Sequence, residues 1–551
     1  MTGPSGVFRR LGGAVGGLSL LAFADMPRIL ISDPLAGPGL DLLQAAADVT
    51  IAPGLKGGAL LDAVREHDAL VVRSATKVSS EVLGAGSRLR VVGRAGVGVD
   101  NIDVDEATRR GIVVVNSAGA STIAVAEHAF ALMLALARNI ATASAAVARG
   151  EWSPGTFVGT ELHGKVLGIV GLGRIGTQVA RRARAFEMRV LAHDPFVSPA
   201  LASACGAELV ALDQLLAESD VVSLHAPLGA STGGLVDASA LAAMKRGAWL
   251  VNCARGGLVD EAALVASLDA GHLGAAALDV FAQEPLAQDS PLRNHPKVLC
   301  TPHLGASTRE AQVEVATDVA RLVLACLRGE HVAGAVNAPL RVPEEIAYLE
   351  PYLRLGEHLG RALVQLTDAR LDAVEVTYHG EVADHDTGPV TAAVIKGLLA
   401  PVSEERVNLI NARHVARSRG LQVSERKVEA GDSPYANVVS VEMGSGAARR
   451  DIAGAIVGSE LRLVRLDGYA VDVAPVGHVL VTRHLDRPGM IGRVGTILGE
   501  GDVNISAMQV GRRTHRGEAV MVMTLDEPVS RDVEGRLAAI DGILSVKQVT
   551  L

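Results

Sequence analysis

The chain has 551 residues, of which 49% are hydrophobic and 21% are charged, and its formal net charge is −9. This length predicts three or four domains with sizeable apolar cores, and the mild acidity without a dense Lys/Arg run argues against a nucleic-acid-binding surface. The four cysteines lie far apart and show no metal-ligand spacing, so no metal site is expected.

The first 25 residues stand apart from the rest of the chain. Arg9 and Arg10 precede an apolar run that ends near Phe23, an arrangement that imitates a secretory signal. Glycines dilute this run, and the alternative is an upstream start codon, with Met26 opening the folded protein. We favour the second interpretation and expect residues 1–25 to lack structure. No stretch reaches the ~18 uninterrupted apolar residues that span a bilayer.

Between residues 28 and 116, short apolar runs alternate with helical patterns and predict a first α/β unit. Two loops in it carry chemically useful groups. The loop 73–77 offers two cations and two hydroxyls, and the glycine-dense turn 93–101 could present backbone amides to an anion. Ordinary strand-to-helix turns with solvated basic residues are an equal alternative. The expected strands are 28–32, 69–72, 91–93 and 113–116, and the expected helices are 39–46, 59–66 and 104–109.

The most informative stretch is 165–195, where an apolar strand leads into GLGRIG, an amphipathic segment and a second apolar strand that ends on Asp194. This is the context that a dinucleotide-binding fingerprint requires. Gly171 permits the tight turn, Gly173 lets backbone amides approach a pyrophosphate, and Gly176 lets the helix pack on the strand. Because an acid at the end of the second strand can accept from both ribose hydroxyls, Asp194 predicts NAD rather than NADP.

A long alanine-rich helix is expected over 121–138, and αβ repeats continue to Cys300. Strands that alternate with helices predict a parallel, doubly wound sheet, whose ligands bind beyond the carboxyl ends of its strands. The expected strands are 166–170, 189–193, the region of 209, 221–225, 249–252, 274–279 and 298–300. The expected helices are 201–205, 212–217, a segment around Met244, and 261–270.

Three of the expected strand ends carry reactive side chains: Arg255 in NCARGG, Glu284 in DVFAQEP and His303 in TPHLGAST. An arginine can grip a carboxylate with its planar fork. A histidine can remove a hydroxyl proton near neutral pH, and a carboxylate can orient it. Singly, each has a structural interpretation, as a surface charge, a loop acid or a capping histidine. Together, beside a dinucleotide-binding unit, they indicate an active site.

The segments VRSATKV, GRAGVGVDN, GLGRIG, NCARGG, ALDVFAQEP and PHLGAST, in this order and spacing, resemble the D-isomer-specific 2-hydroxyacid dehydrogenases. Within that family the resemblance is to the long-form D-3-phosphoglycerate dehydrogenases, and it covers nearly all of the chain after Met26. It implies two doubly wound parallel-sheet domains, an α+β intervening domain and a ferredoxin-like ACT domain. The implied boundaries are 26–120 with 308–340 for the substrate domain, 121–307 for the NAD-binding domain, 341–475 for the intervening domain and 476–551 for the ACT domain.

The resemblance implies NAD-dependent oxidation of D-3-phosphoglycerate to 3-phosphohydroxypyruvate, at the entry to L-serine synthesis, in the cytoplasm. His303 would be the general acid/base, Glu284 its carboxylate partner, and Arg255 the anchor for the substrate carboxylate and C2 oxygen. The rest of the substrate would be held by Arg73, Lys77, Gly96, Val97, Gly98 and Asn101, with Arg73 and Lys77 on the phosphate. The implied NAD contacts are Gly171, Gly173, Arg174, Ile175, Gly176, Asp194, Ala226, Cys253, Asp279, Gly305 and Ala306.

The chain departs from the family pattern at a few positions. Val97 and Ala226 stand where many relatives have threonine, and Gln283 replaces a common glutamate beside Glu284. None of these changes removes a chemically necessary group. Two other functions stay open: a glyoxylate or hydroxypyruvate reductase, against which Asp194 and the basic loop 73–77 weigh, and an NAD-sensing scaffold or corepressor.

The expected intervening domain has helices near 353–366 and 390–400 and a strand at 373–378. Its segment 408–420 carries three arginines and a histidine, which indicates either an effector pocket or a solvated helix face; these are Arg413, His414, Arg417 and Arg419.

The last 76 or so residues follow a βαββαβ order that is typical of a ferredoxin-like unit. Its expected strands are 479–483, 503–510, 518–525 and 543–550, and its expected helices are 489–499 and 529–540. The resemblance to an ACT domain implies amino-acid binding between paired copies, with Asp486 and Asn504 facing the ligand. L-serine feedback in a homo-oligomer, expected to be a tetramer, is therefore the hypothesis, and a purely structural dimerisation domain is the alternative.

Overall fold

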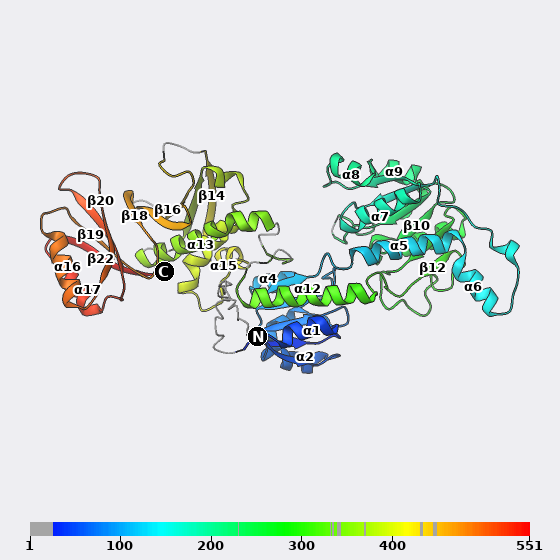
Figure 1. Cartoon of the computed structure of the whole chain (residues 1–551), viewed down its shortest axis with the longest axis horizontal. Helices are drawn as coiled ribbons and strands as arrows, with labels where there is room; N and C mark the ends of the chain where they lie inside the picture. Colours follow the sequence, from blue (N-terminus) through cyan, green and yellow to red (C-terminus); the bar gives the residue numbers. More distant parts are fainter. Residues whose placement is uncertain are drawn as a thin grey trace, which may run out of the picture.

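A computed structural model describes residues 26–229, 231–330, 332, 335–338, 343–367, 371–429, 433–444 and 449–551. Residues 1–25, for which we expected no structure, and the expected boundary at 340/341 lie outside the described residues. The molecule is elongated, and four units follow one another along it (Figure 1). The unit at the right end of the view, drawn in cyan and green, contains the glycine turn, and the last 74 residues, in red, form the left end.

The first unit has a five-stranded parallel sheet in the order β2-β1-β3-β4-β5. The sequence analysis missed the edge strand β2, whose residues are mostly exposed and so form no apolar run. The long helix α12 (Arg309–Leu327) returns from the second unit and packs on this sheet. Its elements are β1 (Arg28–Ile31), α1 (Gly37–Gln44), β2 (Asp48–Ile51), α2 (Gly57–Arg65), β3 (Ala69–Val72), α3 (Ser80–Ala85), β4 (Val91–Arg94), α4 (Val104–Arg109) and β5 (Val113–Asn116).

The second unit has a seven-stranded parallel sheet in the order β12-β11-β10-β9-β6-β7-β8. The strand order reverses between β6 and β9, where a doubly wound sheet opens a crevice for its ligand. Its strands are β6 (Val166–Val170), β7 (Arg189–His193), β8 (Glu208–Leu209), β9 (Val221–Leu224), β10 (Trp249–Asn252), β11 (Ala275–Leu278) and β12 (Val298–Cys300). Its helices are α5 (Thr122–Ala137), α6 (Ile140–Ala148), η1 (Pro154–Phe157), α7 (Arg174–Ala185), α8 (Pro199–Cys205), α9 (Leu212–Glu218), α10 (Ala238–Ala243), η2 (Gly256–Leu258) and α11 (Glu261–Asp269).

One expected helix of this unit is misplaced. Met244 is not the centre of a helix but the residue that follows α10, because the Asp237 side chain caps the helix start and the chain turns at Met244. Among the described helices, none is by itself long and apolar enough to cross a membrane, although α5 and α6, bent by 63° at their junction, meet that criterion as a pair on length and composition.

The third unit has a six-stranded sheet in the order β14-β13-β15-β16-β17-β18, antiparallel except for the β13–β14 pair. Helices α13 and α14 pack closely against each other beside it (Figure 1). The elements are α13 (Pro343–Leu366), β13 (Ala373–His379), η3 (Glu381–Asp384), α14 (Gly388–Leu399), η4 (Ala400–Val402), α15 (Ala412–Ser418), β14 (Gln422–Val428), β15 (Val438–Met443), β16 (Arg450–Val457), β17 (Glu460–Leu466) and β18 (Tyr469–Val473).

The fourth unit is the expected βαββαβ arrangement, with strand order β20-β21-β19-β22 and both helices on one face. Its elements are β19 (His478–Leu485), α16 (Met490–Glu500), β20 (Ile505–Arg512), β21 (Glu518–Leu525), α17 (Arg531–Ala538) and β22 (Ile543–Thr550).

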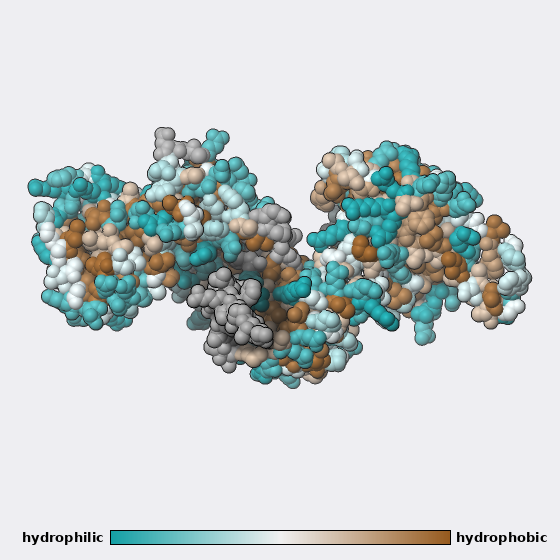
Figure 2. Space-filling model, viewed as in Figure 1, coloured by the Kyte–Doolittle hydropathy of each residue, from teal (hydrophilic) through white to brown (hydrophobic). Residues whose placement is uncertain are grey.

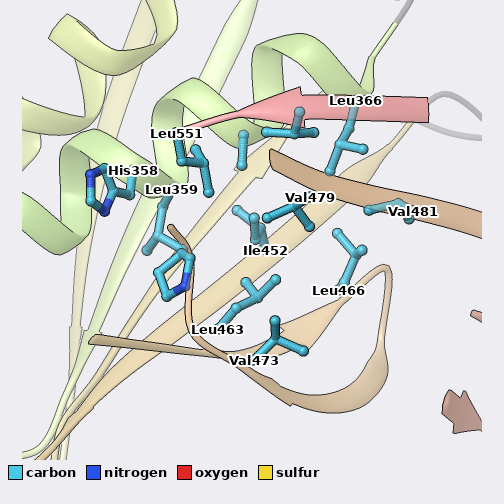
Figure 3. Close-up of a pocket in the computed structure, with 13 residues that line it drawn as sticks. His358, Leu359, Leu366, Ile452, Leu463, Leu466, Val473, Val479, Val481 and Leu551 are labelled. Atoms are coloured by element: carbon cyan, nitrogen blue, oxygen red, sulfur yellow. The ribbon is translucent and has the colours of Figure 1, made fainter. Parts of the chain in front are cut away.

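The third and fourth units share one hydrophobic core. Val479, Val481 and Val549 of the last sheet are buried in the same cluster as Leu463 and Leu466 of β17. A cavity of about 20 Å³ remains between them, and Figure 3 shows apolar side chains from both units around it. A space of this size holds about one water molecule. We conclude that the two units pack as one body.

Candidate active site

The glycine turn after β6 has the shape that a dinucleotide requires. Gly171 has φ +93°, and a Cβ there would lie 2.7 Å from the His225 carbonyl oxygen. A Cβ on Gly176 would lie 2.1 Å from the Gly171 carbonyl oxygen, so only glycine lets α7 pack on the strand. Gly173 has nothing within 4 Å of its Cβ position, which leaves the amino end of α7 open to a phosphate. Arg174 and Ile175 form the first turn of α7.

Asp194 follows β7, beside the same turn. Its Oδ2 accepts from the Leu172 amide at 2.8 Å, and its Oδ1 accepts from the Phe196 amide at 2.9 Å. Because each carboxylate oxygen has a second lone pair, both can still accept from a ribose hydroxyl. The carboxylate is therefore fixed beside the phosphate-binding turn. The residues present fit a bound NAD molecule.

Two further expected NAD contacts lie at neighbouring strand ends. Ala226 is half-buried after β9, and Cys253 is buried after β10. Burial and the nearby Asp279 carboxylate raise the pKa of the Cys253 thiol far above its ordinary value. The thiol therefore stays protonated and can form a wall of the site but cannot act as a nucleophile.

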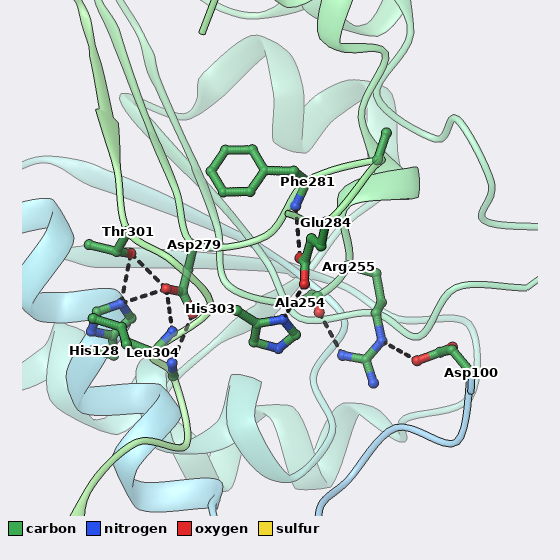
Figure 4. A network of polar contacts seen from close by, with 12 residues as sticks. Asp100, His128, Ala254, Arg255, Asp279, Phe281, Glu284, Thr301, His303 and Leu304 are labelled. Carbon is green, nitrogen blue, oxygen red and sulfur yellow. Dashed lines mark hydrogen bonds and ion pairs between the residues drawn. The ribbon is translucent and has the colours of Figure 1, made fainter. Parts of the chain in front are cut away.

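His303 and Glu284 form a direct pair. The Nδ1 atom of His303 lies 2.8 Å from Oε2 of Glu284, and Oε1 of Glu284 accepts from the Phe281 amide at 3.1 Å (Figure 4). A carboxylate only accepts, so Nδ1 carries the proton and Nε2 is the free base. Within the part of the chain that the structure describes, Nε2 has no partner. His303 has φ +56°, a conformation that is uncommon outside glycine and that often marks functional positions.

Arg255 reaches from the second unit to a loop of the first. Its Nε donates to Oδ2 of Asp100 at 2.9 Å and its Nη1 to the Ala254 carbonyl at 2.6 Å. A Cβ on Gly98 would lie only 1.8 Å from Arg255 Nη2, so a glycine is needed beneath the guanidinium. The Arg255 loop also touches the loop that leads to Glu284, since a Cβ on Gly256 would lie 1.8 Å from the Phe281 carbonyl carbon.

Hydrogen bonds with the side chains of Asp33 and Asn101 hold the loop 73–77 in place. Oδ2 of the buried Asp33 accepts from the Arg73 amide at 2.6 Å, and Oδ1 accepts from the Thr76 hydroxyl at 2.8 Å. Asn101 donates its side-chain amide to the carbonyls of Arg73 and Thr76 at 2.7 and 2.6 Å. Asn101 thus positions the loop with its nitrogen. The side chains of Arg73 and Lys77 have no ion-pair partner among the described residues.

One cation near the site, Arg94, was not predicted from the sequence. Arg94 ends β4, and a Cβ on Gly96 would lie 1.4 Å from its Nη1, so the guanidinium lies against the backbone of the glycine turn. Its Nε is buried without a partner. Burial, together with the like charges of Arg255 and Arg73, lowers the pKa of Arg94 to about 10. The GR pair at a predicted strand end was the available signal, but only the fold brings three guanidinium groups together.

Backbone groups of the turn 93–101 are already paired. The Val97 carbonyl accepts from the Asn116 side chain, whereas Gly96 and Gly98 contribute no side chain. The turn therefore forms the floor under Arg94 and Arg255.

Asp279, an expected NAD contact, is buried and fully engaged by neighbouring donors. It is 1% exposed, and its carboxylate accepts from Thr301 Oγ1 at 2.6 Å, the Leu304 amide at 2.7 Å and the Gly305 amide at 2.8 Å. Burial alone would raise the pKa of Asp279, but these donors and His128 hold it below its ordinary value. Gly305 and Ala306 lie two and three residues after His303, so this carboxylate anchors the loop that carries all three.

The structure does not bring Asp486 and Asn504 together in one copy. Asp486 follows β19 and pairs with Arg512, whereas Asn504 donates to Oδ2 of Asp526 at 2.6 Å. The register of β19 and β21 places these two positions at opposite ends of the sheet. Eight strand residues at about 3.3 Å each separate them by roughly 25 Å. A small ligand can touch both only between two copies.

The arginines of 408–420 are mostly committed to local contacts. Arg413 pairs with Glu425 and donates to the Gly388 carbonyl, and Arg419 donates to Ser403 Oγ at 2.6 Å. His414 and Arg417 are exposed. This arrangement favours the solvated-face interpretation. No cluster of three potential metal ligands occurs within the described ranges.

Comparison with protein families gives three matches. Residues 130–305 match the NAD binding domain of the D-isomer specific 2-hydroxyacid dehydrogenases, residues 348–467 match the D-3-phosphoglycerate dehydrogenase intervening domain, and residues 478–542 match the ACT domain. The three matches follow the order of the last three structural units.

Curated relatives cover nearly the whole chain. A D-3-phosphoglycerate dehydrogenase of Synechocystis sp. is 44% identical over 96% of this chain and 95% of its own length. Proteins of the same name from Methanocaldococcus jannaschii and Bacillus subtilis are 42% and 41% identical over 96% of this chain and 100% of theirs.

Solved structures match the first two units. A glyoxylate reductase from Paecilomyes thermophila is 33% identical with a TM-score of 0.53, and the match covers 59% of this chain and 100% of its own. The D-lactate dehydrogenase of Aquifex aeolicus, complexed with NAD and lactic acid, is 28% identical with a TM-score of 0.50 and covers 55% and 96%. The predicted parallel-sheet architecture and NAD as cofactor are thereby confirmed.

Proposed function

This chain belongs to the D-isomer specific 2-hydroxyacid dehydrogenases, on their D-3-phosphoglycerate dehydrogenase branch, and from that premise we propose that it oxidises D-3-phosphoglycerate to 3-phosphohydroxypyruvate. The observation that carries the proposal is the His303–Glu284 pair, whose loop contacts the loop of Arg255 through Gly256 and Phe281. This product would enter L-serine synthesis. The free cysteines of the described chain agree with a cytoplasmic setting.

His303 would act as the general base. Its Nδ1–H is held by Glu284, so Nε2 can take the proton of the substrate C2 hydroxyl. Bound NAD⁺ supplies the acceptor for the hydride that leaves C2. Arg255 would hold the substrate carboxylate and stabilise negative charge on the C2 oxygen as the proton leaves. The step yields the 2-oxo acid, NADH and a proton on His303, which solvent then removes.

Arg73 and Lys77 would bind the phosphate, with Arg94 beneath them. The first two side chains are unpaired in the described chain, and Arg94 adds a buried positive charge nearby. A phosphate carries up to two negative charges, so a convergence of cations distinguishes it from the small hydroxy acids without phosphate. Gly96, Val97, Gly98 and Asn101 would shape this half of the site.

NAD would be held by the turn 171–176, by Asp194 on the adenosine ribose, and by the walls at Ala226, Cys253 and 305–306. Asp194 would repel the 2′-phosphate of NADP, which supports NAD over NADP. Asp279 would act on this half of the site through the loop that it anchors.

The test compares His303→Asn and Arg255→Gln with the unaltered chain. Both variants should bind NADH normally, as measured by its fluorescence, because neither side chain contacts the turn 171–176 in the described structure. Both should lose turnover of D-3-phosphoglycerate by about 100-fold or more. Full activity in either variant would contradict its assigned role. A matched control is His295→Leu, which removes a similar His–Asp contact at the amino end of β12.

We propose L-serine as a feedback inhibitor that binds between two ACT domains. The opposite placement of Asp486 and Asn504 in one copy supports a ligand shared by two antiparallel copies. Asp486→Ala and Asn504→Ala should each abolish serine inhibition and leave turnover unchanged without serine. Inhibition that survives both substitutions would favour a purely structural ACT domain.

Homo-oligomers would form through the segment 140–158, called the arm here, which contains α6 and η1. Contacts between ACT domains would join such oligomers into a tetramer. The arm exposes large apolar side chains, with Trp152 84%, Val158 82% and Val147 56% exposed. Figure 2 shows brown residues gathered over this end of the molecule. Such a surface is typical of an interface between copies. Trp152→Asp should lower the oligomer mass measured by light scattering; an unchanged mass would exclude the arm.

A further inference from the structure

His128, on α5, contacts the buried carboxylate that anchors the loop of His303. Its Nε2 lies 3.2 Å from Oδ1 of Asp279 and 3.2 Å from Oγ1 of Thr301 (Figure 4). The Thr301 hydroxyl donates to the same Oδ1 at 2.6 Å, so its oxygen is free to accept. Asp279 and the Thr301 oxygen are thus both acceptors, and His128 must donate from a protonated Nε2.

The partners of Asp279 come from segments that adjoin the two connections between the first and second units. The chain first crosses between β5 and α5, and His128 lies on α5. It crosses back through α12, and Leu304 and Gly305 precede that helix by only a few residues. The α5 helix also touches this loop at Val125, whose side chain lies 3.4 Å from the Cβ position of Gly305. A displacement of α5 is therefore passed to the loop through direct contacts.

The loop needs such support because its central residue has an unfavourable backbone conformation. His303 has φ +56°, and its amide donates to the Asp279 carbonyl at 2.9 Å. Non-glycine residues keep this conformation only where surrounding contacts impose it. The backbone and the carboxylate of Asp279 hold three successive amides, those of His303, Leu304 and Gly305.

We propose that His128 is a positioning residue for the dehydrogenase reaction, and that it sets the place of His303 by orienting the Asp279 carboxylate. The inference rests on the proposed function of His303 as the base. The hydrogen bond from His128 fixes the rotation of the carboxylate, and the carboxylate fixes the loop. The contact also ties α5, and with it the first connection between the units, to the catalytic loop.

Three substitutions separate this role from simple packing. Glutamine places its side-chain nitrogen near the position of histidine Nε2, so His128→Gln keeps the donor. Asparagine is polar but too short to reach Asp279, and His128→Leu fills the space without a donor. His295→Leu is the control, since Nε2 of His295 lies 3.3 Å from Oδ1 of Asp269, a similar contact remote from the loop.

The measurements are kcat, KM for D-3-phosphoglycerate and the melting temperature of the full chain. We expect His128→Asn and His128→Leu to lower kcat by about tenfold or more, with KM unchanged, because misplacement of a reacting group acts on the chemical step. His128→Gln should recover most of the lost kcat, and His295→Leu should keep all of it. If His128→Leu lowers the melting temperature strongly, the difference in kcat between His128→Asn and His128→Gln tests the role of the hydrogen-bond donor instead.

Two results would overturn the inference: wild-type kcat in His128→Asn, or a loss in His128→Gln as large as in His128→Asn. His303→Asn is assayed in parallel. Turnover retained in His303→Asn would instead remove the proposed function on which the inference rests, so the two failures are distinguishable.

Discussion

Glu284 decides which nitrogen of His303 is basic. Its carboxylate accepts the Nδ1 proton at 2.8 Å, and its other oxygen is held by the Phe281 amide. An amide at this position could present its NH₂ group to Nδ1 and favour the tautomer whose Nε2 carries the proton. A carboxylate, and not an amide that also carries an oxygen, is therefore expected to be needed to keep the proton on Nδ1 of His303.

Glu284→Gln should lower kcat by about 100-fold, within the range that general acid–base catalysis contributes. The affinity for NADH should not change, since Glu284 does not contact the turn 171–176 in the described structure. Stopped-flow turnover and nucleotide fluorescence measure the two quantities. A variant with normal kcat would show that the carboxylate has no part in orienting His303.

His484, in the last sheet, links stability to pH. It is 2% exposed and its Nδ1 is buried without a partner, and burial lowers its pKa below the ordinary value of 6.5 although Asp486 opposes this. The unfolded chain thus binds a proton that the folded chain excludes. The contribution of His484 to the free energy of unfolding is fully present above pH 6.5. It falls as the pH drops from 6.5 towards the pKa of His484 in the folded chain, by at most about 1.4 kcal/mol per pH unit.

His484→Phe should therefore flatten the decline of the melting temperature between neutral pH and mildly acidic pH. The exposed His515→Asn is the control and should leave the decline as it is. An equal decline in His484→Phe and the unaltered chain would contradict this account.

At the scale of elements, the buried parallel strands were predictable and the exposed ones were not. The parallel strands β3, β5, β10 and β12 have the expected bounds because each contains an apolar run, and so does the buried antiparallel strand β21. The residues of the edge strand β2 are mostly exposed and form no apolar run, and the short helix α3 was not predicted either. Met244 was expected inside a helix, whereas the Asp237 side chain caps a helix that begins at Ala238 and ends at Ala243, just before Met244.

The residues of the candidate site, too, could be predicted from the sequence only in part. Arg255, Glu284 and His303 could be selected from strand ends and motifs. Arg94, Asp33 and His128 could not, because their importance lies in contacts with residues distant in the sequence, such as Thr76, 43 positions from Asp33, and Asp279, 151 positions from His128. A sequence pattern gives each residue type, but only the packing of two units gives its partners.

The contact between β4 and α12 gives a test at the scale of elements. A Cβ on Gly93 would lie 2.6 Å from Val323 and 2.9 Å from Val319, so the helix rests directly on the strand. Gly93→Ala should lower the free energy of unfolding by about 1–3 kcal/mol, as is usual for overpacking.

Val323→Ala should restore part of the stability lost in Gly93→Ala, because it removes the closest methyl group. Urea unfolding of the single and double variants measures this coupling. Strictly additive losses would show that the two residues do not meet.

At the scale of the whole molecule, the ACT domain and the intervening domain depend on each other. Valines of β19, β21 and β22 complete the cluster that includes Leu463, Leu466 and Val473. Gln365 adds two hydrogen bonds to Thr550: its Nε2 donates to the Thr550 carbonyl at 3.1 Å, and its Oε1 accepts from the Thr550 amide at 3.0 Å. The intervening domain in turn docks on the first unit, where Asn408 donates to the Gly111 carbonyl at 2.7 Å.

Truncation after Val476 should therefore expose apolar surface and not leave a clean, shorter enzyme. We expect increased binding of a hydrophobic dye and a lower melting temperature of the intervening domain, with the NAD-binding unit unaffected. A truncated chain as stable as the full one would mean that the shared core contributes little. For the serine test, point substitutions are preferable for this reason.

We propose that a phosphorylated D-hydroxy acid is oxidised with NAD⁺ between the first two units. Formation of NADH by the full chain, compared for D-3-phosphoglycerate, D-glycerate and D-lactate, tests it most directly. We predict that kcat/KM for D-3-phosphoglycerate exceeds that for D-glycerate by about 100-fold or more, since charge-assisted hydrogen bonds to the phosphate are lost in D-glycerate. Equal rates for D-glycerate and D-3-phosphoglycerate, or no oxidation of the latter, would contradict the account.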